Sequence, residues 1–408
     1  MKKISLLGLC LFTGLSMMAQ TNVVKDVERQ LKGGSPNYQD ALNKIKPALQ
    51  NDETKGLAQT WYLAGKAGFG VYDQAYIQES LGQSLDAKGK RNAGQSLIDG
   101  YNYYLTAIPL DKKPDEKGKV KPKYTKDIIK AASSNYQQLK NAGIFLFEGQ
   151  DYKGAYDAWE LYVTLPNNEL LGDGAPKAEP DSVVGNIMYY QTLAALEANE
   201  NDKALKKANQ AMEKGFNNID IYRYGVEAAR RLNDSIALVD MATKGYEKFG
   251  TEDISFVGQL INDRLAAEDY AASHKLVSDA IAGTNNDSTK IKSQLYDILG
   301  FIYEQEGNVD LAMQNFNKAI ELDPDFAKPV FDLGRIIYNE AVKLDENYTD
   351  EAVRTEKVTP KLLEAAKYFE KAYGMDPDNM TQIPNIMYRL YYRLGEGYED
   401  KATEWQNK

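Results

Sequence analysis

The chain has 408 residues, of which 26% are charged, and its formal net charge is −10 at pH 7. This length exceeds that of one ordinary globular core, and the acidic balance disfavours nucleic acid and anionic membrane surfaces as partners. One cysteine and one histidine exclude an intramolecular disulfide and leave too few ligands for a thiolate or histidine metal site.

The N-terminus has the order of a secretory signal peptide. Two lysines and an apolar run at residues 4–15 precede a small residue, Ala19, and a polar segment. The run is too short to span a bilayer. We predict a signal peptide at residues 1–19. The mature protein is expected in the periplasm, elsewhere in the cell envelope or outside the cell, and without a transmembrane helix. The alternative is a lipoprotein anchored through Cys10.

Residues 20–135 carry degenerate helix patterns. A first helix pair is expected at about residues 23–50, and a second begins near Trp61 and stops at Pro109. Residues 110–126 lose the periodicity and combine many lysines with two prolines. This composition is typical of a solvated loop, and a docking loop for an acidic partner is the alternative.

The central segment, residues 136–292, predicts four further helix pairs. Their second helices carry small and aromatic residues spaced three and four apart, such as Ala155, Trp159 and Tyr162. Residues with this spacing share one helix face, where two antiparallel helices can approach closely. The only histidine, His274, lies on the second helix of the weakest pair, where we expect a surface position.

The most regular pattern lies at residues 293–326. It predicts two amphipathic helices joined by a turn at Gly307-Asn308, and Pro324 ends the second helix because proline cannot continue it. The positions that carry the pattern are Tyr296, Leu299, Gly300, Tyr303, Ala312, Phe316, Ala319 and Pro324. This spacing resembles the tetratricopeptide repeat (TPR) family.

The resemblance implies an all-α fold, a right-handed superhelical solenoid of helix pairs. A single pair leaves an apolar flank uncovered and therefore needs stacked neighbours. The pattern is strongest over residues 293–377, with an insertion at about 341–360. Residues 378–408 are expected to form one C-terminal helix that caps the last apolar flank.

In stacked repeats of this family the first helices line a concave surface, which we expect to be the binding groove. The residues expected on it are Lys140, Phe147, Tyr189, Tyr222, Asp297, Phe301, Phe331, Arg335 and Tyr338. Aromatic residues and arginine carry most of the energy at protein interfaces. Packing against adjacent repeats is the alternative for each ring. Ile144 and Val226 replace the asparagines of carboxylate-clamping members, so a carboxylate clamp is not expected.

The sequence favours a scaffold or adaptor that binds a protein or peptide, and not an enzyme. It contains no GxxxxGK[ST] phosphate-binding loop, and it predicts no cofactor and no metal. A glycan-binding or glycan-processing helical protein of the cell envelope is the alternative, because exported tyrosine-rich surfaces can also stack sugars. A structural spacer is a third possibility. The partner's identity and the oligomeric state are left open.

Overall fold

The computed structural model describes residues 20–347 and 351–408, and every regular element within these ranges is a helix. The predicted signal peptide lies outside the described residues. The chain divides into two compact units, which meet in sequence at Ser235 and Ile236. Within each unit consecutive helices pack in pairs, which confirms the expected all-α solenoid of helix pairs.

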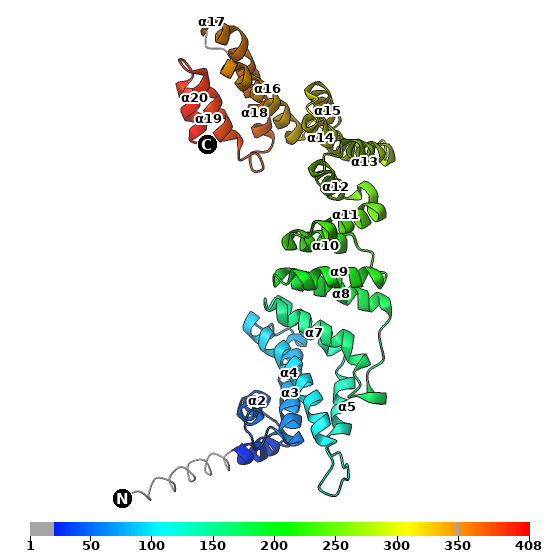
Figure 1. Ribbon diagram of the computed structural model, residues 1–408. Coiled ribbons are helices and arrows are strands. Elements are labelled where there is room, and N and C mark those ends of the chain that lie inside the picture. Colours follow the sequence, from blue (N-terminus) through cyan, green and yellow to red (C-terminus); the bar gives the residue numbers. More distant parts are fainter. Residues whose placement is uncertain (1–19, 348–350) are drawn as a thin grey trace, which may run out of the picture. The chain divides into compact units, whose positions relative to one another are not determined.

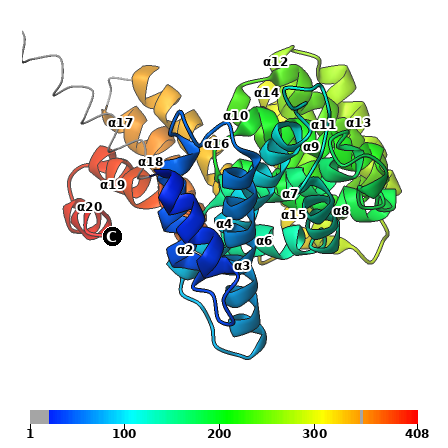
Figure 2. The ribbon, with the colours of Figure 1, turned by 90° about the horizontal axis from the view of Figure 1, so that it is seen from below.

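The first unit begins with helical residues 20–31. Its further elements, coloured blue to green in Figure 1, are α2 (Tyr38–Ile45), η1 (Lys46–Leu49), α3 (Ala58–Ser80), α4 (Ala87–Asp111), α5 (Thr125–Ser134), α6 (Gln138–Glu148), α7 (Tyr152–Thr164), η2 (Leu165–Asn167), η3 (Gly172–Gly174), α8 (Asp181–Glu197), α9 (Asn201–Glu213) and α10 (Ile219–Leu232). Figure 2 shows α2 beside α3, where their apolar faces form one buried cluster.

The long helices α3 and α4 approach closely because glycine lies at their contact. A Cβ atom on Gly68 would lie 2.5 Å from the carbonyl oxygen of Ser96, so no larger residue fits there. Helix α4 continues to Asp111, two residues beyond the expected end at Pro109. Pro109 lies in its last turn, where the missing N–H group removes a single helical hydrogen bond.

The lysine-rich segment is a loop that is closed at its base. Residues 112–123 are exposed. The Asp111 carboxylate accepts hydrogen bonds from the backbone N–H groups of Lys123, Tyr124 and Thr125, at 2.7–3.0 Å. It also accepts one from the Thr125 hydroxyl at 2.7 Å. These bonds join the end of α4 to the start of α5.

The second unit contains the most regular pair of the sequence. Its elements are α11 (Ser235–Phe249), η4 (Gly250–Glu252), α12 (Ile254–Ala266), α13 (Tyr270–Gly283), α14 (Thr289–Gln305), α15 (Val309–Leu322), α16 (Ala327–Asn347), α17 (Glu351–Val353), η5 (Arg354–Val358), α18 (Thr359–Met375), α19 (Ile383–Leu394) and α20 (Glu399–Gln406). The insertion is expected at about residues 341–360. This range contains the end of α16, which extends to Asn347, and then α17 and η5.

The turn between α14 and α15 forms where the sequence predicts it. Gly307 adopts a φ of 83°, which glycine tolerates without steric cost. The Asn308 side chain then caps α15 by accepting a hydrogen bond from the backbone N–H of Leu311 at 3.3 Å. Phe316, on α15, is fully buried.

The C-terminal segment corrects one prediction. It forms two helices, α19 and α20, that pack against each other, and not the single capping helix expected over residues 378–408. Gly395 and Gly397 separate them with φ angles of 77° and 89°. Backbone in this region favours glycine and ends a helix. The tyrosine pattern alone could not show this break, because it continues on both sides of the two glycines.

Candidate functional site

An apolar groove lies on the first unit, between α6 and α8 and above α7. Its volume is about 440 Å³. We call it the α6–α8 groove, and its lining residues are Lys140, Asn141, Ile144, Phe147, Glu148, Trp159, Asn186, Ile187, Tyr190 and Leu193. Lys140 and Phe147, which the sequence predicted for a concave surface, both belong to it.

The floor of the groove follows from a small residue on α6. A Cβ atom on Gly143 would lie 2.2 Å from Nε1 of Trp159, so glycine allows the indole ring to lie across the helix. The indole N–H donates a hydrogen bond to the Lys140 carbonyl at 3.2 Å. Trp159 itself is 3% exposed. The ring is therefore held by packing and by a hydrogen bond.

Two large apolar side chains remain exposed beside this floor. Ile144 is 47% exposed and Tyr190 is 42% exposed. The Tyr190 ring lies 5.8 Å from that of Trp159, and Phe147 meets Tyr152 edge to face at 5.1 Å. These residues give the groove an apolar centre made of side chains from three helices.

Charged residues mark the two ends of the α6 part of the groove. The Lys140 ammonium lies 5.5 Å from the centre of the Tyr162 ring, a distance at which a cation is attracted to the ring face. Glu148, eight residues further along the helix, pairs with Lys90 at 2.5 Å. The α6 part of the groove thus has a lysine at one end and an ion-paired glutamate at the other, about two helical turns apart.

The other two predicted residues of the first unit lie outside this groove. Tyr189 is half-buried, and its ring contacts those of Phe216 and Tyr224 at 5.1 and 5.7 Å. Tyr222 is 6% exposed and belongs to the packed interior. Sequence reasoning missed Tyr190, which is adjacent to Tyr189. It also noted Ile144 only as a replaced asparagine, although an isoleucine on a solvent-facing helix position was a usable signal.

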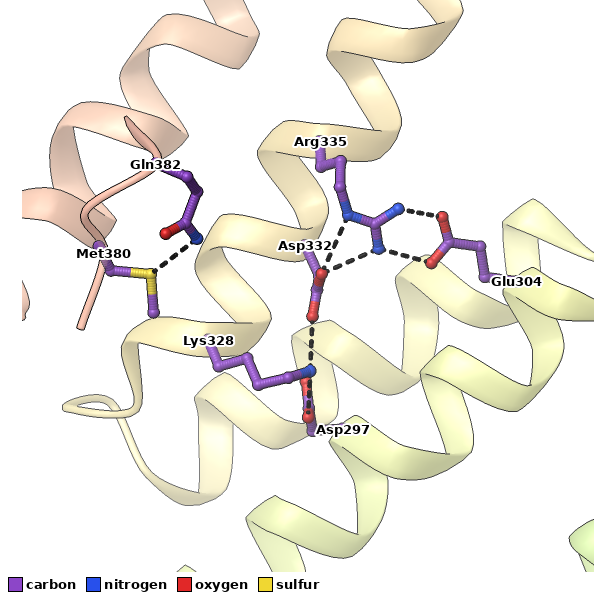
Figure 3. A network of polar contacts seen from close by, with 7 residues as sticks. All are labelled: Asp297, Glu304, Lys328, Asp332, Arg335, Met380 and Gln382. Carbon is purple, nitrogen blue, oxygen red and sulfur yellow. Dashed lines mark hydrogen bonds and ion pairs between the residues drawn. The ribbon is translucent and has the colours of Figure 1, made fainter. Parts of the chain in front are cut away.

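Two predicted residues of the second unit, Asp297 and Arg335, belong to an acid–base network on α14 and α16 (Figure 3). We use this name for Asp297, Glu304, Lys328, Asp332 and Arg335. Lys328 donates to Asp297 and to Asp332, each at 2.8 Å. Arg335 binds both oxygens of Glu304 at 2.5 and 2.7 Å and also donates to Asp332 at 2.9 Å.

Asp297 is the most unusual member of the acid–base network. It is 4% exposed, and among the described residues its Oδ1 atom has no hydrogen-bond partner. Burial of the carboxyl raises its pKa to about 6, and the nearby positive charge of Lys328 only partly offsets this effect. A buried carboxylate costs free energy unless it is fully paired. Asp297 therefore loses its proton near pH 6, well above the ordinary range of an aspartate.

Two of the remaining predicted rings of the second unit pack against α18. Phe331 and Tyr338 contact Phe369 at centroid distances of 5.6 and 6.2 Å. Phe301 is half-buried. Because the Arg335 guanidinium is already engaged by two carboxylates, a partner would have to displace Glu304 or Asp332. The role of the predicted residues Phe301, Phe331, Arg335 and Tyr338 in binding therefore stays a prediction.

The described residues show no helix long and apolar enough to cross a membrane. Over the same residues, no group of histidine, cysteine, aspartate and glutamate side chains could hold a metal ion. His274, expected at the surface, is half-buried: its ring lies 4.5 Å from that of Tyr303, and its Nε2 atom is 3.1 Å from Glu306.

The helix pairs and the surface groove define a helical-repeat protein. Residues 293–326 match the tetratricopeptide repeat family, so the chain carries a tetratricopeptide repeat at the position where the sequence resemblance was strongest. No curated protein matches the chain at a significant level.

Several solved structures resemble the chain at low identity. The C-terminal part of a TPR repeat-containing protein from Cytophaga hutchinsonii is 14% identical, with a TM-score of 0.40, covering 65% of this chain and 93% of that one. A TPR repeats protein from Bacteroides fragilis is 16% identical, with a TM-score of 0.29, covering 66% and 98%. YrrB, described as a TPR protein with an unusual peptide-binding site, is 14% identical, with a TM-score of 0.35, covering 51% and 96%.

Proposed function

We propose that the chain is an exported scaffold or adaptor that binds a protein partner through the α6–α8 groove. The observation that carries this proposal is the exposure of Ile144 and Tyr190 in a groove that the buried Trp159 ring also lines. Large apolar side chains at the surface of a soluble domain are typical of interaction sites when they cluster around a hollow. Tetratricopeptide repeats commonly mediate interactions between proteins.

The chemistry of the groove favours a peptide segment with an apolar anchor side chain. The centre offers rings and aliphatic groups, and burying an apolar anchor there removes its surface from water. Asn186 is exposed at the rim and offers an amide to a peptide backbone. Lys140, at one end, can orient a segment that carries a negative charge, whereas Glu148 at the other end is already paired with Lys90.

Export is the second part of the proposal. It is supported by the order of charged, apolar and small residues at positions 1–19. An exported adaptor of this kind would act on partners in the cell envelope or outside the cell.

Site-specific crosslinking tests the groove. A photoreactive amino acid at Ile144 is expected to capture a partner in cells, whereas the same group at Ile77 is not. Ile77 provides the matched control because it is 57% exposed on α3, in the same unit, and does not line the groove.

The captured partner is then purified, and its affinity is measured by calorimetry. Ile144→Glu should weaken binding at least about tenfold, or about 1.4 kcal/mol, with an unchanged circular dichroism spectrum. Equal capture from both positions, or equal affinity of the Ile144→Glu and Ile77→Glu variants, would place the binding surface elsewhere.

A further inference from the structure

A second hollow, in the C-terminal unit, combines arginines with tyrosines. It has a volume of about 420 Å³ and lies among α16, η5 and α19. We call it the arginine–tyrosine pocket, and its lining residues are Tyr338, Arg354, Tyr388, Arg389, Tyr392 and Arg393. A chain with a formal charge of −10 thus concentrates three cations in one hollow.

Asp345 holds two of these arginines in place. Arg354 donates from Nε to one of its oxygens, and Arg393 donates from Nη1 to the other at 2.7 Å. Arg354 also donates to the backbone carbonyl of Arg393 at 3.0 Å. Glu351 lies 3.5 Å from Arg354 but is 82% exposed, so solvent screens most of its charge.

The third arginine is not neutralised in this way. Arg389 is exposed, and among the described residues no ion pair includes it. The pocket therefore holds three guanidinium groups, of which two pair with the largely covered Asp345 carboxylate, and it keeps a positive surplus. Arg389 is the group that an incoming anion would meet first.

The tyrosines follow from the spacing of α19. Tyr388 and Tyr392 are four residues apart, as are Arg389 and Arg393, so all four lie on the same side of the helix. The opposite side, with Met387, is buried. The rings of Tyr388 and Tyr392 are 6.1 Å apart, and Tyr392 is 74% exposed. A large exposed ring beside a cation is typical of an interface anchor.

The lining restricts the class of ligand. Guanidinium groups bind planar carboxylates through paired N–H donors, while the phenol rings offer flat apolar faces. Three guanidinium groups in one hollow favour an anionic ligand over a neutral one. A volume of about 420 Å³ exceeds the need of a single small anion. The net charge of the chain opposes a long polyanion such as nucleic acid.

We propose that the arginine–tyrosine pocket binds an acidic peptide segment of a protein partner. A glutamate or aspartate carboxylate lies against the guanidinium groups of Arg389 and Arg393, and neighbouring side chains of the segment pack on Tyr388 and Tyr392. This site is separate from the α6–α8 groove, and it stands or falls independently of the function proposed for that groove.

Fluorescence anisotropy tests the site with the full mature chain at low salt. The probe is a short fluorescein-labelled peptide of glutamate and tyrosine, compared with its glutamine analogue. We expect the acidic peptide to bind and the glutamine analogue to bind at least about tenfold more weakly. Arg389→Gln should weaken binding of the acidic peptide at least about tenfold, and Arg389→Lys by less, because lysine keeps the charge but not the paired donors.

Arg29→Gln is the matched control, since Arg29 is 79% exposed and lies in the first unit. It should leave the affinity unchanged. Tyr392→Ala should also weaken binding, which separates a peptide site from a site for bare charge. Equal affinity of Arg389→Gln and wild-type protein would overturn the proposal. Free glutamate and inorganic phosphate should displace the labelled peptide much less well than unlabelled acidic peptide does. Equal displacement at equal concentrations would also overturn the proposal.

Discussion

At the scale of single residues, burial decides what the charged side chains of this protein do. Asp297 and Asp345 are both largely buried aspartates that meet positive groups. Burial disfavours the charged form of Asp345, but hydrogen bonds from Arg354 and Arg393 outweigh it and lower its pKa. Asp297 has Lys328 as its cation, and there burial outweighs the pairing and raises the pKa to about 6. Two causes explain the opposite outcomes: Asp297 is more deeply buried and faces the negative charge of Asp332, whereas Asp345 has two arginine donors.

Asp297 should therefore make the second unit less stable as pH rises. Its pKa is about 6 in the folded chain against 3.8 for the group in its ordinary state, so between these values the folded state holds a proton that the unfolded state releases. The contribution of this proton to the free energy of unfolding is complete below about pH 4. It is lost as the pH rises through 6, and it amounts to at most about 3 kcal/mol.

Urea unfolding at pH 4.5 and pH 7 measures this effect. Asp297→Asn should lose this share of the pH dependence and gain stability at pH 7 relative to wild type. Asp287→Asn, at an exposed loop position, controls for the loss of one negative charge and should follow the wild-type profile. If the Asp297→Asn variant kept the wild-type profile, the carboxyl would be ionised throughout this range.

At the scale of helices, small residues decide how closely two helices of a pair can pack. Gly143 and Gly300 occupy the same place in their respective pairs, and each lies under an aromatic ring of the second helix. In α14 and α15 that ring is Phe316, which is fully buried. The core of this pair therefore depends on the Phe316 ring and on the space that glycine leaves for it at position 300.

Gly300→Ala should destabilise the second unit. The new Cβ atom would lie 2.7 Å from the Phe316 ring and 3.1 Å from the Ala312 carbonyl oxygen. Overpacking of this kind costs about 1–3 kcal/mol, which denaturant titration can measure.

Gly258→Ala is the control, because Gly258 lies in α12 and a Cβ atom there has nothing within 4 Å. Alanine favours the helix, so this variant should gain about 0.5–1 kcal/mol. If the two substitutions changed the stability equally, close packing against Phe316 would not be the reason for glycine at position 300.

At the scale of the whole molecule, the two units bury separate apolar clusters. One large cluster extends from α3 to α10, and another joins α16, α18, α19 and α20. In helical repeats each element contacts only its neighbours. A chain of 408 residues can therefore grow without a single central core. Its surface can carry separate binding sites along its length.

Processing is the prediction that concerns the whole chain. Cleavage after Ala19 should give a mature protein that begins at Gln20, and intact-mass analysis of the exported protein measures it. A variant with Leu6→Arg, which breaks the apolar run, should stay uncleaved and unexported. Retention of residues 1–19 on exported wild-type protein, or an acyl chain on Cys10, would contradict this prediction.

The sequence by itself determined the helices, the turn at Gly307-Asn308 and the core face of the repeat at residues 293–326. These features depend on spacing within about 34 residues, and spacing alone shows which side of a helix is apolar. Two of the residues predicted for a binding surface, Lys140 and Phe147, line the α6–α8 groove, and their role in binding stays a prediction.

Only the tertiary structure decided which apolar or charged side chains remain available. Tyr189 packs against Phe216 while the adjacent Tyr190 is exposed, and Arg335 is engaged by Glu304, which lies 31 positions earlier in the chain. The sequence could not show this because the periodicity of one helix does not specify which neighbour covers its second face. That choice depends on how successive pairs stack, and stacking is set by contacts between residues that are distant in sequence.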